Sequence, residues 1–275
     1  KQLVKKAAEE FKQIDKSETI RVISHLDADG LSSAAITVKM LSNDNRKYCL
    51  STVHQLTEDV IKQLAEESYK CYIFTDLGTG QFSLLKTHLA NKKVFILDHH
   101  HLQQEISAQN ILHVNPHLVG IEESNSISGA GVAYFFAKAL DENNKNLANV
   151  ALIGAIGDMQ ESQGFSGLNA EILEEAKTSG KLKVIKGLRF FGAQTKPLHK
   201  MLVQSTEYVI PGISGNESAA VQFLHQIGIK PKEGEKWRRL IDLSDEELQK
   251  LVTATVLQRI SEQEKSPEAI IGSVY

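Results

Sequence analysis

Short apolar runs alternate with amphipathic segments over residues 20–114, and this alternation limits the fold of the chain more than any other feature. The predicted strands are residues 20–24, 48–53, 71–75, 94–97 and 111–114. Helical patterns separate the first four strands, near residues 29–42, 57–67 and 80–90. Such alternation is typical of a parallel sheet that helices cover on both faces. We therefore expect an α/β fold with a five-stranded parallel sheet.

The rest of the chain is predicted to be mostly helical. Helical patterns occur at residues 1–14, 129–140, 147–157, 168–179, 218–227 and 245–262. Two of them, 129–140 and 147–157, are apolar nearly all round, which indicates buried helices. Turn-forming residues cluster at 211–217. We expect a first domain at residues 1–205, which carries the sheet, and a helical extension at residues 206–275.

Composition and charge exclude several classes of protein. A net charge of −3 lacks the footprint of a strongly basic nucleic-acid binder, so any nucleic-acid contact must come from a local groove or bound metal. Cys49 and Cys71 match no zinc pattern and are too few for a disulfide framework, which predicts reduced thiols. No apolar stretch approaches the roughly 20 residues of a membrane span. We expect a cytoplasmic protein without a membrane partner.

Acidic and imidazole side chains follow three of the predicted strands. They are His25, Asp27 and Asp29 after the first strand, Asp76 after the third, Asp98, His99, His100 and His101 after the fourth, and Asp158 beyond the helix at 147–157. Right-handed crossovers place the carboxyl ends of parallel strands at one edge of the sheet, so the strand-end groups are expected to meet there. Asp158, at a helix end, would close the site.

Each motif alone has a simpler interpretation. An isolated HLD is usually part of a surface loop, a run of histidines can be a solvated turn, Asp76 can cap a helix and Asp158 can end one. Their joint position at successive element ends favours a common site. Four carboxylates and three imidazoles cannot be buried without partners. Two divalent cations would balance the four negative charges, and the mixed ligands suit manganese, iron, zinc or magnesium.

Four segments, in this order and spacing, resemble the motifs of the DHH phosphoesterase superfamily: SHLDADGLSSAAI, TDLG, LDHHH and GAIGDMQ. The form HLDADG, followed by SGAGVAYFFAKAL at residues 128–140, is similar to RecJ-like nucleases. The segments YVIPGISGNESAAVQFLHQIGI and WRRLIDLSDEELQKL resemble archaeal RecJ-like proteins that associate with the replication factor GINS. The resemblance covers residues 20–160 and, more loosely, 205–260.

The resemblance implies a pair of metal ions, manganese in the first place and magnesium as the alternative. One ion would be held by His25, Asp27 and Asp76. The second ion would be held by Asp29, Asp76, His99 and Asp158, so that Asp76 bridges the two.

Further residues beside these ligands are candidates for a role. The resemblance implies that His100 faces the scissile phosphate and that Asp98 orients a histidine ring. His101 is not among the family's motif residues. Ser128 and Gly129 open a helix whose free N–H groups are candidates for phosphate binding, although Ser128 can equally be a simple helix cap.

The implied function is that of a single-strand-specific exonuclease, which hydrolyses DNA or RNA to 5′-mononucleotides with a metal-activated water in DNA replication or repair. Two alternatives stay open. One is a small-molecule phosphoesterase, such as a pyrophosphatase or an oligonucleotide or cyclic-dinucleotide phosphodiesterase. The other is a replisome scaffold that binds GINS and the replicative helicase.

One expected motif is not found in the chain. RecJ-like proteins carry a second domain with a glycine-rich GGH-type substrate motif after the catalytic domain, and no such motif occurs here. The sequence ends on the apolar, strand-like run AIIGSVY. We therefore expect a fragment of a longer protein that lacks its C-terminal domain, and the alternative is a protein in which substrate binding is supplied in another way.

Overall fold

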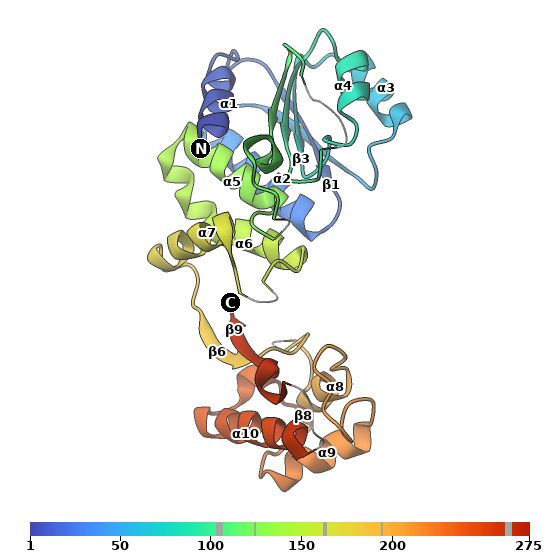
Figure 1. The fold of residues 1–275 in the computed structure, drawn as a ribbon, viewed down its shortest axis with the longest axis vertical. Coiled ribbons are helices and arrows are strands. Elements are labelled where there is room, and N and C mark those ends of the chain that lie inside the picture. Colours follow the sequence, from blue (N-terminus) through green and yellow to red (C-terminus); the bar gives the residue numbers. More distant parts are fainter. Residues whose placement is uncertain (103–106, 124, 162–163, 194, 262–265) are drawn as a thin grey trace. The chain divides into compact units, whose positions relative to one another are not determined.

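The computed structural model describes the chain except for residues 103–106, 124, 162–163, 194 and 262–265. The described chain forms two compact units, Lys1–Leu182 and Lys183–Tyr275 (Figure 1). Among the helices in the described ranges, none is both long enough and apolar enough to cross a membrane. Cys49 and Cys71 are free thiols, and burial raises the pKa of Cys71 to about 12.

The first unit is built on one five-stranded parallel sheet, as predicted. Its strands are β1 (Ile20–His25), β2 (Tyr48–Val53), β3 (Cys71–Thr75), β4 (Lys93–Leu97) and β5 (Ile111–Val114). Their order across the sheet is β2-β1-β3-β4-β5, and every neighbouring pair is parallel. Each strand lies within one residue of its predicted position, because an apolar run that ends at turn-forming residues marks a buried strand clearly.

Helices cover both faces of this sheet (Figure 1). They are α1 (Gln2–Lys12), α2 (Ala28–Asn43), α3 (Glu58–Glu66), α4 (Phe82–His88), α5 (Gly129–Leu140), α6 (Ala148–Gly157) and α7 (Gly167–Thr178), with the 3₁₀ turns η1 (Pro116–Val119) and η2 (Glu142–Leu147). Helices α1, α2 and α5 bury apolar side chains against one face, beside Ile73 and Phe95. Helices α3 and α4 pack on the other face, beside Tyr72 and Phe74. Because successive strand residues point to opposite faces and helices cover both faces, β3 is buried throughout.

The sheet order places the carboxyl ends of β1, β3 and β4 side by side. Ser24 is paired with Thr75, and Thr75 with Leu97, so the three strands end at the same level. The Asp76 N–H continues the ladder by donating to the Leu97 carbonyl at 2.9 Å. The residues that follow these strands therefore meet at one edge of the sheet.

Helix α6 differs from the prediction of a fully buried helix. Ala151 and Leu152 are buried, but Ile153 is 55% exposed and Ile156 is 38% exposed. The helix packs against α2, α5 and α7. An apolar helix is buried only on the sides where its neighbours lie, and these neighbours leave Ile153 and Ile156 at the surface.

The second unit combines helices with two pairs of short strands. Its helices are α8 (Leu198–Val203), α9 (Glu217–Gln226) and α10 (Asp245–Ser261), with the 3₁₀ turns η3 (Leu240–Asp242) and η4 (Pro267–Ile270). Antiparallel pairs are formed by β6 (Ile185–Leu188) with β9 (Ile271–Val274), and by β7 (Lys232–Glu233) with β8 (Lys236–Trp237). The strand-like run at the end of the sequence thus pairs with a segment that the sequence did not mark as a strand.

The division between the two units lies earlier than the boundary expected at residue 205. Leu188, Leu198 and Leu202 are buried in the core of the second unit, together with Leu251. Residues 183–205 therefore pack with the second unit. The turn-rich segment at 211–217 lies inside this unit and leads into α9.

Candidate metal centre

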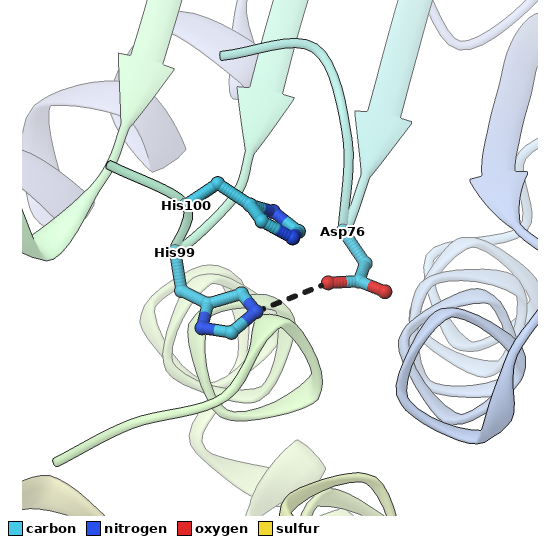
Figure 2. A group of neighbouring side chains, drawn as sticks. All are labelled: Asp76, His99 and His100. Atoms are coloured by element: carbon cyan, nitrogen blue, oxygen red, sulfur yellow. Dashed lines mark ion pairs between the residues drawn. The ribbon is translucent and has the colours of Figure 1, made fainter. Parts of the chain in front are cut away.

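Imidazole and carboxylate side chains meet at the edge where β1, β3 and β4 end. His25 is the last residue of β1, Asp76 directly follows β3, and His99 and His100 lie just beyond β4. Figure 2 shows Asp76, His99 and His100 on neighbouring strand ends, with the His99 ring directed at the Asp76 carboxylate. One ligand atom from each of these three residues lies within 4.8 Å of the others.

The first of two further groups contains His25, Asp27 and Asp76. His25 Nδ1 lies 2.8 Å from Asp27 Oδ2 and 3.7 Å from Asp76 Oδ2. Asp27 also caps α2, because its Oδ1 accepts a hydrogen bond from the Gly30 N–H at 2.8 Å. The cap holds Asp27 in place with its second oxygen close to His25. The three ligand atoms are near enough to one another to hold one cation.

The other group contains Asp29, His99 and Asp158. His99 Nε2 lies 3.7 Å from Asp29 Oδ2 and 3.3 Å from Asp158 Oδ2. The same nitrogen lies 3.3 Å from Asp76 Oδ1. One oxygen of Asp76 is thus near His25 and the other near His99, so the six predicted ligands lie together in two groups that Asp76 joins.

Asp29 is held against the N-terminus of α5. It is 1% exposed, and its carboxylate accepts hydrogen bonds from the Gly129 N–H at 2.6 Å and the Ala130 N–H at 2.9 Å. Burial raises the pKa of Asp29, while His99 and the Ala130 N–H act against that rise. A Cβ added at Gly154 would lie 2.3 Å from Asp29 Oδ1, so α6 approaches this carboxylate closely only because it has glycine there.

Asp76 is a buried carboxylate whose negative charge receives little stabilisation from hydrogen bonds. It is 2% exposed, and its φ of 58° lies in the left-handed region. Within the described part of the chain no hydrogen-bond donor satisfies its Oδ1, although the His99 ring lies at ion-pair distance. Burial raises the pKa of Asp76 to about 10, and the charges of Asp29, Asp98 and Asp27 add to the rise. A cation would satisfy this buried oxygen, so the residues present fit a pair of divalent metal ions.

Asp98 lies outside the groups that could hold a metal among the described residues, and it contacts His100. Asp98 Oδ1 lies 2.7 Å from His100 Nδ1 and accepts the His99 backbone N–H at 2.8 Å. Its other oxygen accepts the Thr79 N–H at 2.9 Å. Burial acts to raise the pKa of Asp98, but the hydrogen bonds from His100 and Thr79 outweigh it and hold the pKa well below its usual range. This is the contact expected of a carboxylate that orients a histidine ring.

A hydrogen-bond network behind the LDHHH segment was not predicted from the sequence. Thr79 Oγ1 lies 2.9 Å from His113 Nε2 and accepts a hydrogen bond from Asn115 Nδ2 at 3.1 Å. Asn115 Nδ2 also donates to the His100 carbonyl at 2.9 Å. Burial lowers the pKa of His113 to about 4, so its ring stays neutral. Hydroxyl and amide side chains are not titratable metal ligands, so the acid and imidazole pattern does not mark them. The position of Asn115 directly after the fifth strand, at the same edge, is the signal that could have found it.

Ser128 and Gly129 are both buried, and Gly129 lies next to the Asp29 and Asp76 carboxylates. Ser128 Oγ accepts the Gly131 N–H at 3.2 Å and so caps α5. The Gly129 N–H donates to Asp29. Both residues thus have contacts inside the protein, and their assignment to substrate binding remains a prediction.

His101 lies outside the groups that could hold a metal among the described residues. Its ring centroid is 4.4 Å from that of His117, with an angle of 32° between the planes. His117 Nε2 in turn lies 3.1 Å from the His99 carbonyl oxygen. The third histidine of the run is therefore held against a second imidazole, beside the centre.

Comparisons of sequence agree with the motifs. Residues 19–157 match the family described as "DHH family, N-terminal domain", and residues 190–271 match the "DHH-CID domain". The uncharacterized protein MJ0831 of Methanocaldococcus jannaschii is 33% identical over 244 residues, which are 87% of this chain and 53% of that protein. YorK of Bacillus subtilis, a putative SPbeta prophage-derived single-strand DNA-specific exonuclease, is 27% identical over 153 residues, 50% of this chain and 25% of that protein. The chain thus spans about half of the first relative's length and a quarter of the second's.

Comparisons of structure find the same fold in two kinds of protein. Exonuclease RecJ bound to manganese has a TM-score of 0.54 at 19% identity, with 94% of this chain and 66% of that chain covered. RecJ from Thermus thermophilus in complex with Mn²⁺ has a TM-score of 0.52 at 22% identity, with 95% and 38% covered. CDC45 from Entamoeba histolytica has a TM-score of 0.64 at 15% identity, with 98% and 57% covered.

Proposed function

Because the chain belongs to the DHH family, whose N-terminal domain its residues 19–157 match, we propose that it is a metal-dependent phosphodiesterase acting on single-stranded nucleic acid. The finer proposal is a RecJ-like exonuclease that releases 5′-mononucleotides in DNA replication or repair. The name of the Bacillus subtilis relative, a putative single-strand DNA-specific exonuclease, supports this substrate class. The observation that carries the proposal is the buried Asp76 carboxylate, whose two oxygens lie near two separate histidines.

Two divalent metal ions fit the residues of the centre. His25, Asp27 and Asp76 would hold one ion. The other would be held by Asp29, Asp76, His99 and Asp158. Bound ions of this kind lower the pKa of a water nucleophile and offset the charge that develops on a phosphate. The four carboxylates balance the charge of two divalent cations, so the loaded centre would be neutral.

His100 and Asp98 would act on the phosphate side of the centre. Asp98 holds the His100 ring through Nδ1 at 2.7 Å, which leaves Nε2 as the nitrogen that can donate to a phosphate oxygen. The His100 side chain is 58% exposed, so a substrate can reach it. Asp98 is buried and would act only through His100, as a positioning residue.

We propose manganese as the metal, with magnesium as the alternative. Magnesium prefers oxygen ligands and keeps several waters, whereas His25 and His99 add imidazole nitrogens to the ligand set. Two RecJ structures that share the fold contain manganese, which supports this choice. Calorimetric titration of each ion into chelator-treated protein would compare them, and tighter binding of magnesium would reverse the choice.

End-labelled single strands of DNA and RNA, with the matching duplexes, test the proposal. The wild-type protein with manganese should release mononucleotides from single strands, and EDTA should stop the release. Asp76→Ala removes the carboxylate that both groups share and should lower the rate by at least about 100-fold, because charge on the phosphate is then poorly offset. Asp59→Ala, which changes an exposed aspartate on α3, is the matched control and should leave the rate unchanged.

Two other outcomes would favour the alternatives. Hydrolysis of pyrophosphate or of a cyclic dinucleotide, without hydrolysis of single strands, would indicate a small-molecule phosphoesterase. Metal binding without hydrolysis of any phosphoester would indicate a replisome scaffold, and binding to purified GINS would then test that role.

A further inference from the structure

A cavity of about 420 Å³ opens beside the candidate metal centre in the first unit. It shares His25, Asp76 and His100 with the centre. The rest of its lining comes mainly from the loop after β2, at residues 54–56, and from the loop between β3 and α4. A molecule in this cavity would therefore lie directly next to a phosphodiester at the centre.

The lining combines an apolar floor with amide side chains. Leu56 and Leu77 are 4% and 8% exposed and contribute apolar surface to the cavity. Gln55 and Gln81 each bring a carboxamide, which offers both donors and an acceptor. Apolar surface suits the flat face of a nucleobase, and carboxamides suit the mixed donors and acceptors on its edge.

The charges around the cavity favour a nucleoside over a chain of phosphates as its ligand. No lysine or arginine is among the described residues that line it. Pyrophosphate and longer phosphate chains carry several negative charges, which proteins usually bind with lysine or arginine side chains. A nucleoside is uncharged. The lining thus fits a nucleoside, with its phosphate at the adjacent metal centre.

Backbone hydrogen bonds fix both loops without using the two glutamine side chains. The Thr57 N–H donates to the Gln55 carbonyl at 3.1 Å, and the Gln81 N–H donates to the Gly78 carbonyl at 3.2 Å. The φ of Gly78 is 110°, a conformation that favours glycine and permits the turn into α4. Over the described ranges, neither the Gln55 nor the Gln81 carboxamide has a hydrogen-bond partner in the protein. Both amides are therefore available to a ligand.

The third histidine of the LDHHH run also belongs to this cavity. His101 contributes to its lining and is held by the ring contact with His117. His101 directly follows His100 in the sequence, and both residues line the cavity. This gives His101 a place in the wall of a binding site, outside the groups that could hold metal.

We propose that this cavity, which we call the nucleoside cavity, binds the sugar and base of the nucleotide next to the cleaved phosphodiester. Gln55 and Gln81 hydrogen-bond to the base edge, while Leu56 and Leu77 contact its face. The assignment rests on the proposed function of the neighbouring centre. A volume at the small end of the roughly 300–1,000 Å³ typical of small-molecule sites suits one nucleoside, which agrees with the proposed release of single nucleotides.

Calorimetry on the full chain with manganese tests the proposal, with AMP and ribose 5-phosphate as probes. These two differ only by the base, so AMP should bind at least about 10-fold more tightly. Gln55→Leu and Gln81→Leu should each weaken AMP binding about 3–10-fold, the effect of one hydrogen bond, without changing the affinity for ribose 5-phosphate. Gln63→Leu, on the exposed surface of α3, is the matched control and should change neither affinity.

Equal affinities for AMP and ribose 5-phosphate in the wild type would overturn the proposal. So would equal AMP affinities for Gln55→Leu, Gln81→Leu and Gln63→Leu. If single strands were still hydrolysed in either case, the proposed function would stand and only the nucleoside cavity would fall. Binding that depends on the base and is weakened by Gln81→Leu, in a protein that hydrolyses no phosphoester, would support the cavity and refute the proposed function.

Discussion

Replacement of Asp76 by asparagine is predicted to stabilise the metal-free protein, although it removes the shared carboxylate of the candidate centre. Burial raises the pKa of Asp76 from its ordinary value of 3.8 to about 10. A pH of 8 lies about four units above this ordinary pKa. The free-energy cost of keeping Asp76 buried at that pH therefore has a ceiling of about 6 kcal/mol. Asparagine is neutral, has the same shape and tolerates a φ of 58°. We expect the free energy of unfolding to rise by about 2–6 kcal/mol.

The pH dependence of this effect has a definite sign. Because the pKa of Asp76 is higher in the folded state than in the unfolded state, the folded state binds the proton more tightly. The resulting stability is complete below about pH 4 and is lost as pH rises from 3.8 to about 10, at up to about 1.4 kcal/mol per pH unit. Asp76→Asn should flatten this slope. Saturating manganese should stabilise the wild type more than the variant, because metal binding needs the ionised carboxylate.

Asp98→Asn is the matched control, since it makes the same change in another buried aspartate at the end of the neighbouring strand. Asp98 accepts backbone hydrogen bonds from Thr79 and His99 and contacts the His100 ring. The amide group of asparagine would face at least one of these donors. We expect a loss of about 2–4 kcal/mol in the free energy of unfolding, opposite in sign to the effect at Asp76.

Thermal and urea unfolding at pH 6 and pH 8, in EDTA and in manganese, check both expectations. In a unit the size of Lys1–Leu182, 1 kcal/mol corresponds to about 2–4 °C in Tm. Asp76→Asn should therefore raise the Tm by about 5 °C or more in EDTA at pH 8, and by less at pH 6. An Asp76→Asn protein with a Tm at or below that of the wild type would refute the view that the metal-free protein fails to stabilise the charge of Asp76. Equal losses of stability in Asp76→Asn and Asp98→Asn would refute it too.

Two glycine substitutions and their controls give further predictions. Gly154→Ala would place a Cβ 2.3 Å from Asp29 Oδ1, and it should cost about 1–3 kcal/mol in urea unfolding and weaken manganese binding in calorimetry. Gly187→Ala, whose Cβ would lie 3.6 Å from its nearest neighbour, should change stability by less than about 0.5 kcal/mol. Met159 has a left-handed φ of 54°, which is strained for a residue with a Cβ. Met159→Gly relieves this strain and should raise the free energy of unfolding by about 0.5–1 kcal/mol. Asn45→Gly, at a φ of 53°, should gain less stability because asparagine tolerates this conformation. A Met159→Gly protein that is less stable than the wild type would contradict the argument from strain.

The sheet and its acidic edge could be predicted because local pattern and chain topology constrain them together. Continuous apolar runs such as VFIL at 94–97 identify buried strands. Right-handed crossovers then leave one edge for the residues that follow. For this reason Asp76 and His99, which follow different strands, lie 3.3 Å apart.

The features that the sequence did not predict depend on distant partners. Strands β6 and β9 have four residues each and pair across nearly the whole second unit, with no short turn between them to mark the pair. Thr79 and Asn115 join the candidate site through hydrogen bonds that only the folded chain creates. Whether Ile153 is covered depends on which sides of α6 have neighbours, and hydropathy alone does not contain that information.

The aspartates of this edge differ in how far the protein itself stabilises their charge. Asp27 accepts an N–H of α2, Asp29 accepts two N–H groups of α5, and Asp98 has His100 and the Thr79 N–H. Each of these three carboxylates therefore has hydrogen-bond donors within the protein, although burial still raises the pKa of Asp29. Asp76 is buried with an oxygen that no described donor satisfies, in the middle of the other charges. The fold thus supplies donors to the surrounding carboxylates, whereas Asp76 Oδ1 would need a cation. If the proposed metal ions bind, we expect their removal to affect Asp76 more than the other aspartates.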